Sequence, residues 1–338
     1  MPTENRQWVL AQRPEGIPDE STFELEDAGS FPLDKDQIRV QVDYFTLDPG
    51  SRPGLTRASY IPIHPIGGVM MSAGVGTVLE SKHEKFKQGD LVVGALGWQE
   101  TAVVSRKGLV KLDSTIFPGM IPVTHALGLL GIPGLTAYFA LLKLAEMKAG
   151  ETVLISSAAG AVGATAGQIA HLHQAKAIGI AGSQQKVDWL ISEANFATAI
   201  NYKETENLSQ AITDACPQGI DIYLDNVGGP TLDAAILNMN QNGRIIISGQ
   251  IAEYTRQNPT GIRNALEFIN RRLTMQGFVV LDYAREFAGA QTQLAQWLAT
   301  GQIKTKEEII QGIENAPAAY AELFTGKSFG RRLIQLKR

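Results

Sequence analysis

Residues 153–170 read VLISSAAGAVGATAGQIA, and this stretch decides the fold. It begins as a buried strand, continues as a turn of small residues and ends as a helix. Such a turn lets the backbone approach the phosphates of a dinucleotide, and the helix N-terminus offers N–H groups with a partial positive charge. Ser157 stands where a first glycine is usual, followed by Gly160 and Gly163. A plain strand–helix turn is the alternative, but the strand before and the helix after favour dinucleotide binding.

Size and composition narrow the classes of protein. The 338 residues suffice for two domains, and the formal net charge of −4 implies no nucleic-acid or membrane partner. No apolar run is long enough to span a bilayer, and residues 1–6 lack the apolar core of a signal peptide. Cys216 is the single cysteine, which excludes an internal disulfide and a multi-cysteine zinc site. We therefore expect a cytoplasmic, soluble protein.

The chain changes character near Gly134. Residues 7 to about 115 contain short strands separated by glycine turns, as in the alternating segment 38–44, and predict a barrel-like module. Residues 135–142 form the beginning of an apolar helix. After it, strands and helices alternate, which predicts a parallel sheet covered on both faces. Short-strand character returns near 331–336. The strands expected in the second part are Thr152–Ile155, Ala177–Ala181, Ala199–Asn201, Ile220–Asp225, Arg244–Ser248 and Met275–Val280.

The end of the second of these strands indicates which dinucleotide binds. In NAD-binding folds an acidic residue at this point holds the adenosine ribose. Residues 179–186 read GIAGSQQK and offer Ser183 and Lys186 but no Asp or Glu. A lysine attracts the ribose 2′-phosphate of NADPH, which a carboxylate would repel. Tyr202, after the third strand, is expected at the same phosphate, whereas the alternative for Lys186 is a solvated residue in the first turn of a helix.

Several segments, in order, carry a family resemblance. They are 47–52 (LDPGSR), 134–139 (GLTAYF), 158–163 (AAGAVG), 182–187 (GSQQKV), 201–203 (NYK), 225–229 (DNVGG) and 278–280 (FVV). With them the chain resembles the medium-chain dehydrogenase/reductase superfamily over nearly its whole length. Within it, the chain is similar to the zinc-independent prostaglandin reductase and alkenal reductase group, which includes bacterial curcumin-reductase-like enzymes. The resemblance implies an α/β protein with a GroES-like domain at 1–126, a Rossmann domain at 127–301, a return to the first domain at 302–338, and an active site in the cleft between the domains.

The resemblance also implies an activity and its residues. The activity is NADPH-dependent reduction of the carbon–carbon double bond of α,β-unsaturated ketones or aldehydes, with hydride transfer to the β-carbon. The residues implied for the pyrophosphate are Gly160, Ala161, Val162 and Gly163, and those for the 2′-phosphate are Ser183, Lys186 and Tyr202. Those implied for the nicotinamide half are Asn226, Ser248, Gly249, Gln250 and Ile251, with Phe278 and Val279 at its carboxamide. Tyr254 matches a tyrosine beside the nicotinamide ribose and the substrate.

Two positions depart from the family pattern. Ala252-Glu253 precedes Tyr254 where Ser-Thr is common, and Ser328 stands where an asparagine often contacts the cofactor. Ser328 keeps a hydroxyl but has a shorter reach than an asparagine side chain.

Metal ligands are missing from the first module. It contains no cysteine, and residues 62–68 (PIHPIGG) leave His64 as a lone histidine that cannot build a tetrahedral zinc site. His171 and His173 are two apart and do not share a helix face. We therefore expect no metal. Asp48 and Arg52 are expected to form a structural i,i+4 ion pair if their segment is helical.

Without a metal, the substrate carbonyl must be polarised by hydrogen bonds. A neutral hydroxyl aimed at the enolate oxygen stabilises the developing charge, and Tyr254 is the candidate, although it can instead simply pack on the nicotinamide. NADPH-dependent quinone reduction and non-catalytic NADPH binding are the alternative functions, because fold does not settle function. A homodimer is expected through the apolar segment 278–281 as an edge strand.

Overall fold

The computed structural model describes residues 5–29 and 32–336, whose backbone forms two compact units. The first unit extends from the N-terminal strand to Leu127 and also contains Glu307–Ser328 and the end of the chain from Arg332. The second contains Gly128–Lys306 and the short segment Phe329–Arg331. Throughout the described part of the chain, helices are too short or too polar to cross a bilayer.

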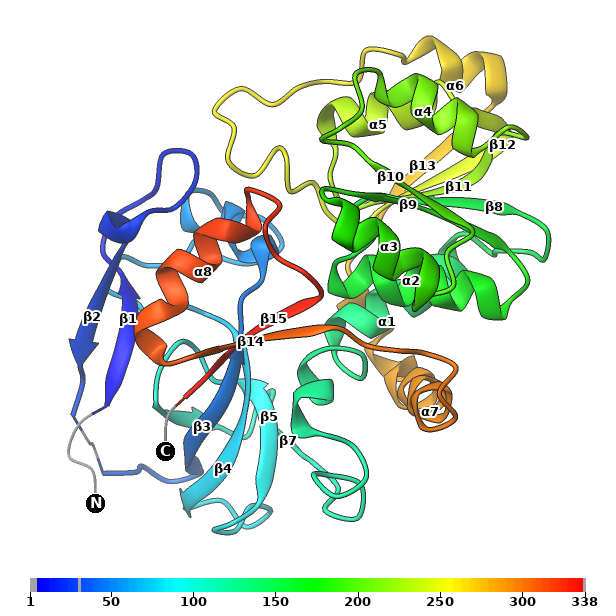
Figure 1. The fold of residues 1–338 in the computed structure, drawn as a ribbon. Helices are drawn as coiled ribbons and strands as arrows, with labels where there is room; N and C mark the ends of the chain where they lie inside the picture. The colour runs from blue at the N-terminus through cyan, green and yellow to red at the C-terminus, as the bar shows by residue number, and fades with distance from the viewer. Residues whose placement is uncertain (1–4, 30–31, 337–338) are drawn as a thin grey trace. The chain divides into compact units, whose positions relative to one another are not determined.

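The first unit is built on antiparallel strands (Figure 1). β1 (Arg6–Leu10) pairs with β2 (Phe23–Asp27), and the larger sheet has the order β14-β15-β3-β4-β5-β7, with β6 also paired to β3. Its strands are β3 (Gln37–Thr46), β4 (Ala73–Ser81), β5 (Leu91–Ala95), β6 (Thr101–Ser105), β7 (Val110–Lys111), β14 (Glu307–Gln311) and β15 (Arg331–Gln335). Short 3-10 helices span Glu20–Thr22, Pro49–Ser51, Pro53–Leu55, Val123–Leu127 and Ile313–Asn315.

Aromatic packing explains why the C-terminal segment belongs to the first unit. Trp98 is 1% exposed and stacks on Phe45, with 5.9 Å between the ring centroids. Tyr320, from helix α8 (Ala316–Leu323), meets the same indole edge-on at 5.3 Å. Burying large rings contributes strongly to core stability. Helix α8 therefore supplies part of the core of the first unit, although most strands of that unit lie far away in sequence.

The second unit contains a parallel sheet of order β10-β9-β8-β11-β12-β13. Helices α2 and α3 cover one face, and α4 and α5 the other (Figure 1). Its strands are β8 (Thr152–Ile155), β9 (Lys176–Ala181), β10 (Thr198–Asn201), β11 (Ile220–Asp225), β12 (Met239–Ile247) and β13 (Thr274–Gly277). Its helices are α1 (Ile132–Phe139), α2 (Ala161–Leu172), α3 (Gln184–Ser192), α4 (Leu208–Ala215), α5 (Gly229–Ile236), α6 (Leu266–Arg271) and α7 (Phe287–Ala299), with a π-helix at Ala140–Leu144 and a 3-10 helix at Val280–Glu286. The expected α/β fold, a β-rich module plus a doubly wound parallel sheet, is confirmed.

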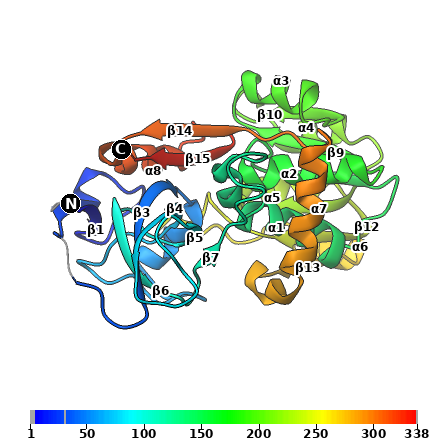
Figure 2. The same ribbon diagram turned by 90° about the horizontal axis from the view of Figure 1, so that it is seen from below.

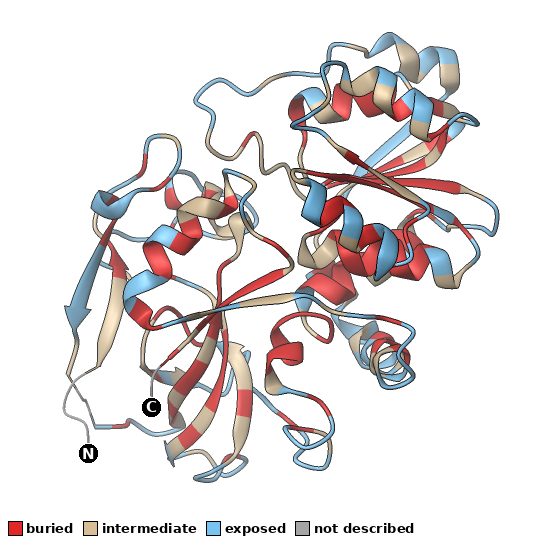
Figure 3. Cartoon of the chain, in the orientation of Figure 1, coloured by how far each residue is buried: buried red, intermediate tan, exposed pale blue. Residues whose placement is uncertain are grey.

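Burial follows the layers of the second unit. All four residues of β8 are buried, as a central strand covered on both faces requires (Figure 3). Figures 1 and 2 show α7 beside α1, where the rings of Tyr138 and Trp297 lie 6.2 Å apart. In contrast to β8, the edge strand β13 is exposed at every one of its residues.

The last strand is shorter than the sequence predicts. The expectation was Met275–Val280, but β13 ends at Gly277 and a 3-10 helix begins at Val280. Gly277 pairs with Ile247, which is the last residue of β12, so residues beyond Gly277 have no partner in the ladder. The expected edge strand at 278–281 is therefore wrong, and the edge lies at Thr274–Gly277.

The expected ion pair between Asp48 and Arg52 is also wrong. Their segment forms 3-10 turns instead of an α-helix, and Arg52 is 3% exposed. Its guanidinium donates to the carbonyl oxygens of Gly16, at 2.8 and 3.0 Å, and Pro14, at 2.9 Å. Arg52 thus anchors a neighbouring loop by satisfying backbone acceptors.

A buried carboxyl group ends the central strand β11. Asp225 is fully buried, and its Oδ1 accepts hydrogen bonds from the Tyr223 hydroxyl at 2.8 Å and from the N–H groups of Val227 and Gly228 at 3.0 and 2.9 Å. The Ser156 hydroxyl donates to the same oxygen at 3.2 Å. Burial raises the pKa of Asp225, although these hydrogen bonds oppose the shift.

We predict a pH-dependent stability difference between the wild type and Asp225→Asn. The Asp225 carboxyl group ionises at a lower pH in the unfolded state than in the folded state. The free energy of unfolding of the wild type therefore falls as the pH rises above the pKa of the unfolded state. Asparagine keeps an acceptor oxygen but does not ionise, so the free energy of unfolding of the variant minus that of the wild type should increase from pH 4 to 7. The increase should be about 1.4 kcal/mol per unit of raised pKa. Denaturant titrations at several pH values measure it, and a difference that does not change with pH would contradict the prediction.

Candidate active site

The glycine turn follows the buried strand β8. Ser157 has φ +49°, a left-handed conformation usual for glycine, and Gly160 caps α2. A Cβ on Gly163 would lie 2.5 Å from the Ser157 oxygen and 2.7 Å from the Ala158 Cα, so only glycine lets the helix pack this close to the turn. The first N–H groups of α2, those of Ala161, Val162 and Gly163, have no acceptor within the helix. This cradle of backbone donors fits a pyrophosphate.

A distant segment reinforces the turn. The Gly330 N–H donates to the Ala159 oxygen at 2.8 Å, and Gly330 forms a parallel bridge with Gly160. Phe329 is buried, with its ring edge-on to Trp189 of α3 at 5.5 Å. Neither Phe329 nor Gly330 is predicted from the sequence, in which only Ser328 of this segment stands out. Contact between Ser328 and a cofactor stays a prediction.

The carboxyl ends of β9 and β10 bring three predicted residues together. Ser183 caps α3 and accepts the Lys186 N–H at 3.4 Å. A Cβ on Gly182 would lie 3.0 Å from the ring of Tyr202, whose own N–H donates to the Ala181 oxygen at 3.0 Å. Burial raises the pKa of the Tyr202 hydroxyl, which stays neutral. Lys186 is only 8% exposed, so the interpretation as a solvated residue is wrong, while a role in phosphate binding stays a prediction.

Asn226 connects the ends of three strands. Its side-chain amide donates to the Ser156 oxygen at 2.8 Å, and the Ser248 hydroxyl donates to its Oδ1 at 2.6 Å. The Ile251 N–H donates to the Asn226 oxygen at 3.2 Å, and the Ala252 N–H to that of Val227 at 3.0 Å. The predicted turn 248–251 is therefore held against the loop that contains Asn226.

Tyr254 folds back over this turn. Its hydroxyl oxygen accepts the Gln250 N–H at 3.1 Å and lies 3.3 Å from where a Cβ of Gly249 would stand. A phenol that accepts from an amide keeps its own O–H as a donor. The geometry therefore permits Tyr254 to donate a hydrogen bond beside the turn, as the catalytic interpretation requires.

Phe278 and Val279 lie just beyond β13. Because Gly277 pairs with Ile247, Phe278 and Ser248 directly follow the ends of neighbouring parallel strands. The Phe278 ring lies edge-on to Tyr283, with 6.4 Å between centroids. The predicted residues of the second unit thus lie at the carboxyl edge of one sheet, where ligands bind in open α/β folds.

His64 and His173 make local contacts with backbone oxygens four residues away. His64 Nε2 lies 3.1 Å from the Gly68 oxygen, and His173 Nδ1 lies 3.0 Å from the Ile169 oxygen. In the described ranges, no group of three or more His, Cys, Asp or Glu side chains is arranged to hold a metal ion.

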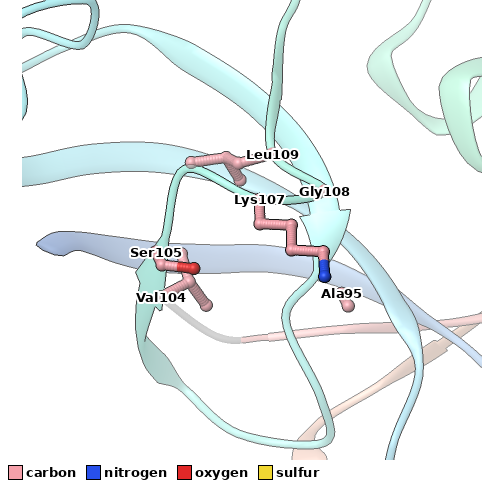
Figure 4. A pocket seen from close by; sticks show the side chains of 6 residues that line it. All are labelled: Ala95, Val104, Ser105, Lys107, Gly108 and Leu109. Atoms are coloured by element: carbon pink, nitrogen blue, oxygen red, sulfur yellow. The ribbon is translucent and has the colours of Figure 1, made fainter. Parts of the chain in front are cut away.

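Figure 4 shows a pocket of about 160 Å³ in the first unit. It is lined by Ala95, Val104, Ser105, Lys107, Gly108 and Leu109. This volume is below the roughly 300–1,000 Å³ usual for ligand sites, and none of the predicted site residues lines it. We therefore do not assign it to the site.

Comparison with known proteins agrees with this geometry. Residues 6–112 match the model of the N-terminal domain of oxidoreductase, and residues 161–297 match the model described as zinc-binding dehydrogenase. The chain is 37% identical to prostaglandin reductase 1 of Mus musculus, with 98% of each chain covered. It is 35% identical to the NADP(+)-dependent 2-alkenal reductase of Nicotiana tabacum, over 99% of this chain and 98% of the relative.

A solved structure is similar over the same extent. It is CurA from Vibrio vulnificus in complex with NADPH, with a TM-score of 0.92, 34% identity, and coverage of 98% of this chain and 99% of that one. The identity extends over nearly the full length of each relative, and the solved structure has the same fold. The chain therefore belongs to the medium-chain dehydrogenase/reductase superfamily, in the group of the prostaglandin and alkenal reductases.

Proposed function

We propose that this protein uses NADPH to reduce the carbon–carbon double bond of α,β-unsaturated ketones or aldehydes. One observation supports this most directly: the Tyr254 hydroxyl is held by Gln250 beside the turn 248–251, at the sheet edge that also carries the glycine turn. The relatives named as prostaglandin and 2-alkenal reductases support the same reaction class.

Different residues at the sheet edge would hold different parts of NADPH. The α2 N-terminus, with Gly160, Ala161, Val162 and Gly163, would bind the pyrophosphate through backbone N–H groups. Lys186, with Ser183 and Tyr202, would hold the 2′-phosphate. The nicotinamide half would lie against Asn226, Ser248, Gly249, Gln250 and Ile251, with Phe278 and Val279 at its carboxamide.

Tyr254 would act on the substrate carbonyl. NADPH, when bound, supplies a hydride to the β-carbon of the enone. Negative charge then develops on the carbonyl oxygen, and a fixed O–H donor stabilises that charge more in the transition state than in the ground state. The Gln250 N–H orients the phenol and strengthens its O–H as a donor.

A substrate panel tests the proposed reaction against the alternatives. NADPH oxidation is followed with short alkenals, long-chain enones, bulky diaryl enones and quinones. Faster turnover of enones than of quinones supports the proposal, whereas the reverse favours quinone reduction. Cofactor binding without turnover of any compound indicates a binding protein.

Cofactor choice tests the role proposed for Lys186. We expect the wild type to prefer NADPH over NADH, and Lys186→Ala to lose that preference, because a charge-assisted contact contributes about 1.5–3 kcal/mol. NADPH binding should weaken roughly 10- to 150-fold while NADH binding changes little. Titration calorimetry with both cofactors measures this, with the exposed neighbour variant Gln185→Ala as control. Equal efficiency of the wild type with NADH would refute the assignment.

The substitution Tyr254→Phe removes the hydroxyl and keeps the ring. Hydride transfer in a single turnover should slow by roughly 10- to 100-fold, or about 1.4–2.7 kcal/mol, with NADPH affinity unchanged. Tyr138→Phe, whose ring packs on Trp297, is the matched control. Transfer at the wild-type rate in Tyr254→Phe would mean that this tyrosine only packs.

We also propose a homodimer, formed through the second unit. β13 is an edge strand whose residues are all exposed, and α6 presents Leu266 and Ile269, which are 66% and 73% exposed. An exposed edge beside apolar side chains is suited to pairing with its own copy. Light scattering at micromolar concentration should give twice the chain mass, and Ile269→Glu should shift the protein toward monomer. A monomeric wild type would rule the dimer out.

A further inference from the structure

The segment after Tyr254 contains no helix or strand as far as Asn264, yet buried carboxylates hold it. Glu253 is 8% exposed, and its Oε2 accepts the Thr260 N–H at 2.7 Å. This bond joins residues seven apart and closes the segment into a loop. A charged acceptor makes such a bond stronger than a neutral one.

Arg256 completes the closure. Its Nε donates to the Ala252 oxygen at 3.1 Å, its Nη1 donates to the Thr260 hydroxyl at 2.8 Å, and its Nε lies 3.8 Å from Glu253 Oε1. Arg256 thus touches the start and the end of the loop and also offsets the buried charge of Glu253. We call Glu253, Arg256 and Thr260 the loop lock.

Helix α5 provides the surface against which the lock is built. A Cβ on Gly229, the first residue of α5, would lie 2.6 Å from Glu253 Oε1, and Gly229 has φ +53°. The carboxylate therefore lies at the positive end of the helix, which favours its charge. The far end of the loop meets the same helix, because Asp233 Oδ1 accepts the Arg263 N–H at 2.9 Å.

The lock and Tyr254 are joined by a single peptide bond. Tyr254 is anchored through its hydroxyl on the Gln250 N–H, and the Glu253 N–H donates to the Gln250 oxygen at 2.9 Å. The Glu253 side chain is thus fixed to the loop beside α5, whereas the Tyr254 side chain is fixed to the 248–251 turn. Fixing both leaves the backbone at Tyr254 little freedom to rotate.

We propose that Glu253 is a positioning residue, which uses the loop lock to aim the Tyr254 hydroxyl and to hold the 254–263 loop in its closed conformation. This inference rests on the proposed function for its effect on catalysis. The closure of the loop, in contrast, is a property of the protein that can be measured without substrate.

Two variants separate the parts of the lock. Glu253→Gln keeps an acceptor for the Thr260 N–H but loses the charge that faces Arg256, and Arg256→Gln removes the cation. Hydride transfer should slow roughly tenfold in each, because a small misplacement of a catalytic group has effects of this size or larger. The KM for NADPH should not change. Glu267→Gln, which breaks an ion pair with Arg271 on α6, is the control and should behave as the wild type.

A double-mutant cycle asks whether the lock acts through Tyr254. In the Tyr254→Phe background, adding Glu253→Gln should slow hydride transfer less than twofold, because the hydroxyl that the lock aims is gone. A merely structural role would produce the same tenfold loss in both backgrounds. Additive effects would therefore overturn the proposal.

Limited trypsin digestion measures the loop itself, since Arg256 and Arg263 are cleavage sites within it. Glu253→Gln should be cut at Arg263 roughly ten times faster than the wild type and Glu267→Gln, because the loop opens more often. If the wild type reduces enones but Glu253→Gln is cut no faster than the wild type, the lock alone is overturned. A wild type that reduces no enone, but whose Glu253→Gln variant is cut faster, would instead overturn the proposed function and with it the role in aiming Tyr254.

Discussion

One oxygen atom, Oδ1 of Asp225, organises the functional edge of the second unit. It accepts hydrogen bonds from Ser156 after β8, from Tyr223 within β11, and from the backbone of Val227 and Gly228. Buried polar groups are costly unless they are bonded, so a change at this point affects every donor that it satisfies. The ends of the two central strands and the loop after β11 therefore behave as one structure.

The rest of the candidate site is built outward from that loop. Asn226 bonds to Ser156 and Ser248, and the 248–251 turn lies on the backbone of Asn226 and Val227. Gly228 and Gly229 have φ of +74° and +53°, conformations that side chains other than glycine rarely adopt. A Cβ on Gly228 would stand 3.1 Å from that of Gln250, so the absence of side chains here permits the close approach. These contacts together fix the position of Tyr254.

Charge is used in two different ways at this edge. The end of β9 lacks the acid of NAD-binding folds, and the first turn of α3 that follows it contains a buried lysine, which suits a phosphate. Beyond the 248–251 turn, Glu253 and Asp233 are buried carboxylates that accept backbone N–H groups of the following loop. The first arrangement is suited to a ligand, whereas in the second the carboxylates order the chain by accepting backbone N–H groups.

The sequence by itself determined the elements and their kind. The period-two strand at 38–44, the apolar strand and small-residue turn at 153–163, and the strand–helix alternation predicted the two modules and the parallel sheet, because these patterns reflect burial that neighbouring residues share. The lack of an acid near Ser183 and Lys186 was also visible, because it depends only on which residues follow the second strand. Only the tertiary structure decided that β13 stops at Gly277, because β12 ends opposite it at Ile247, and that Gly330 returns to the glycine turn. It also decided which carboxyl groups are buried: Asp225 and Glu253 look like ordinary acids in the sequence, since the donors that surround them lie on segments brought together by folding.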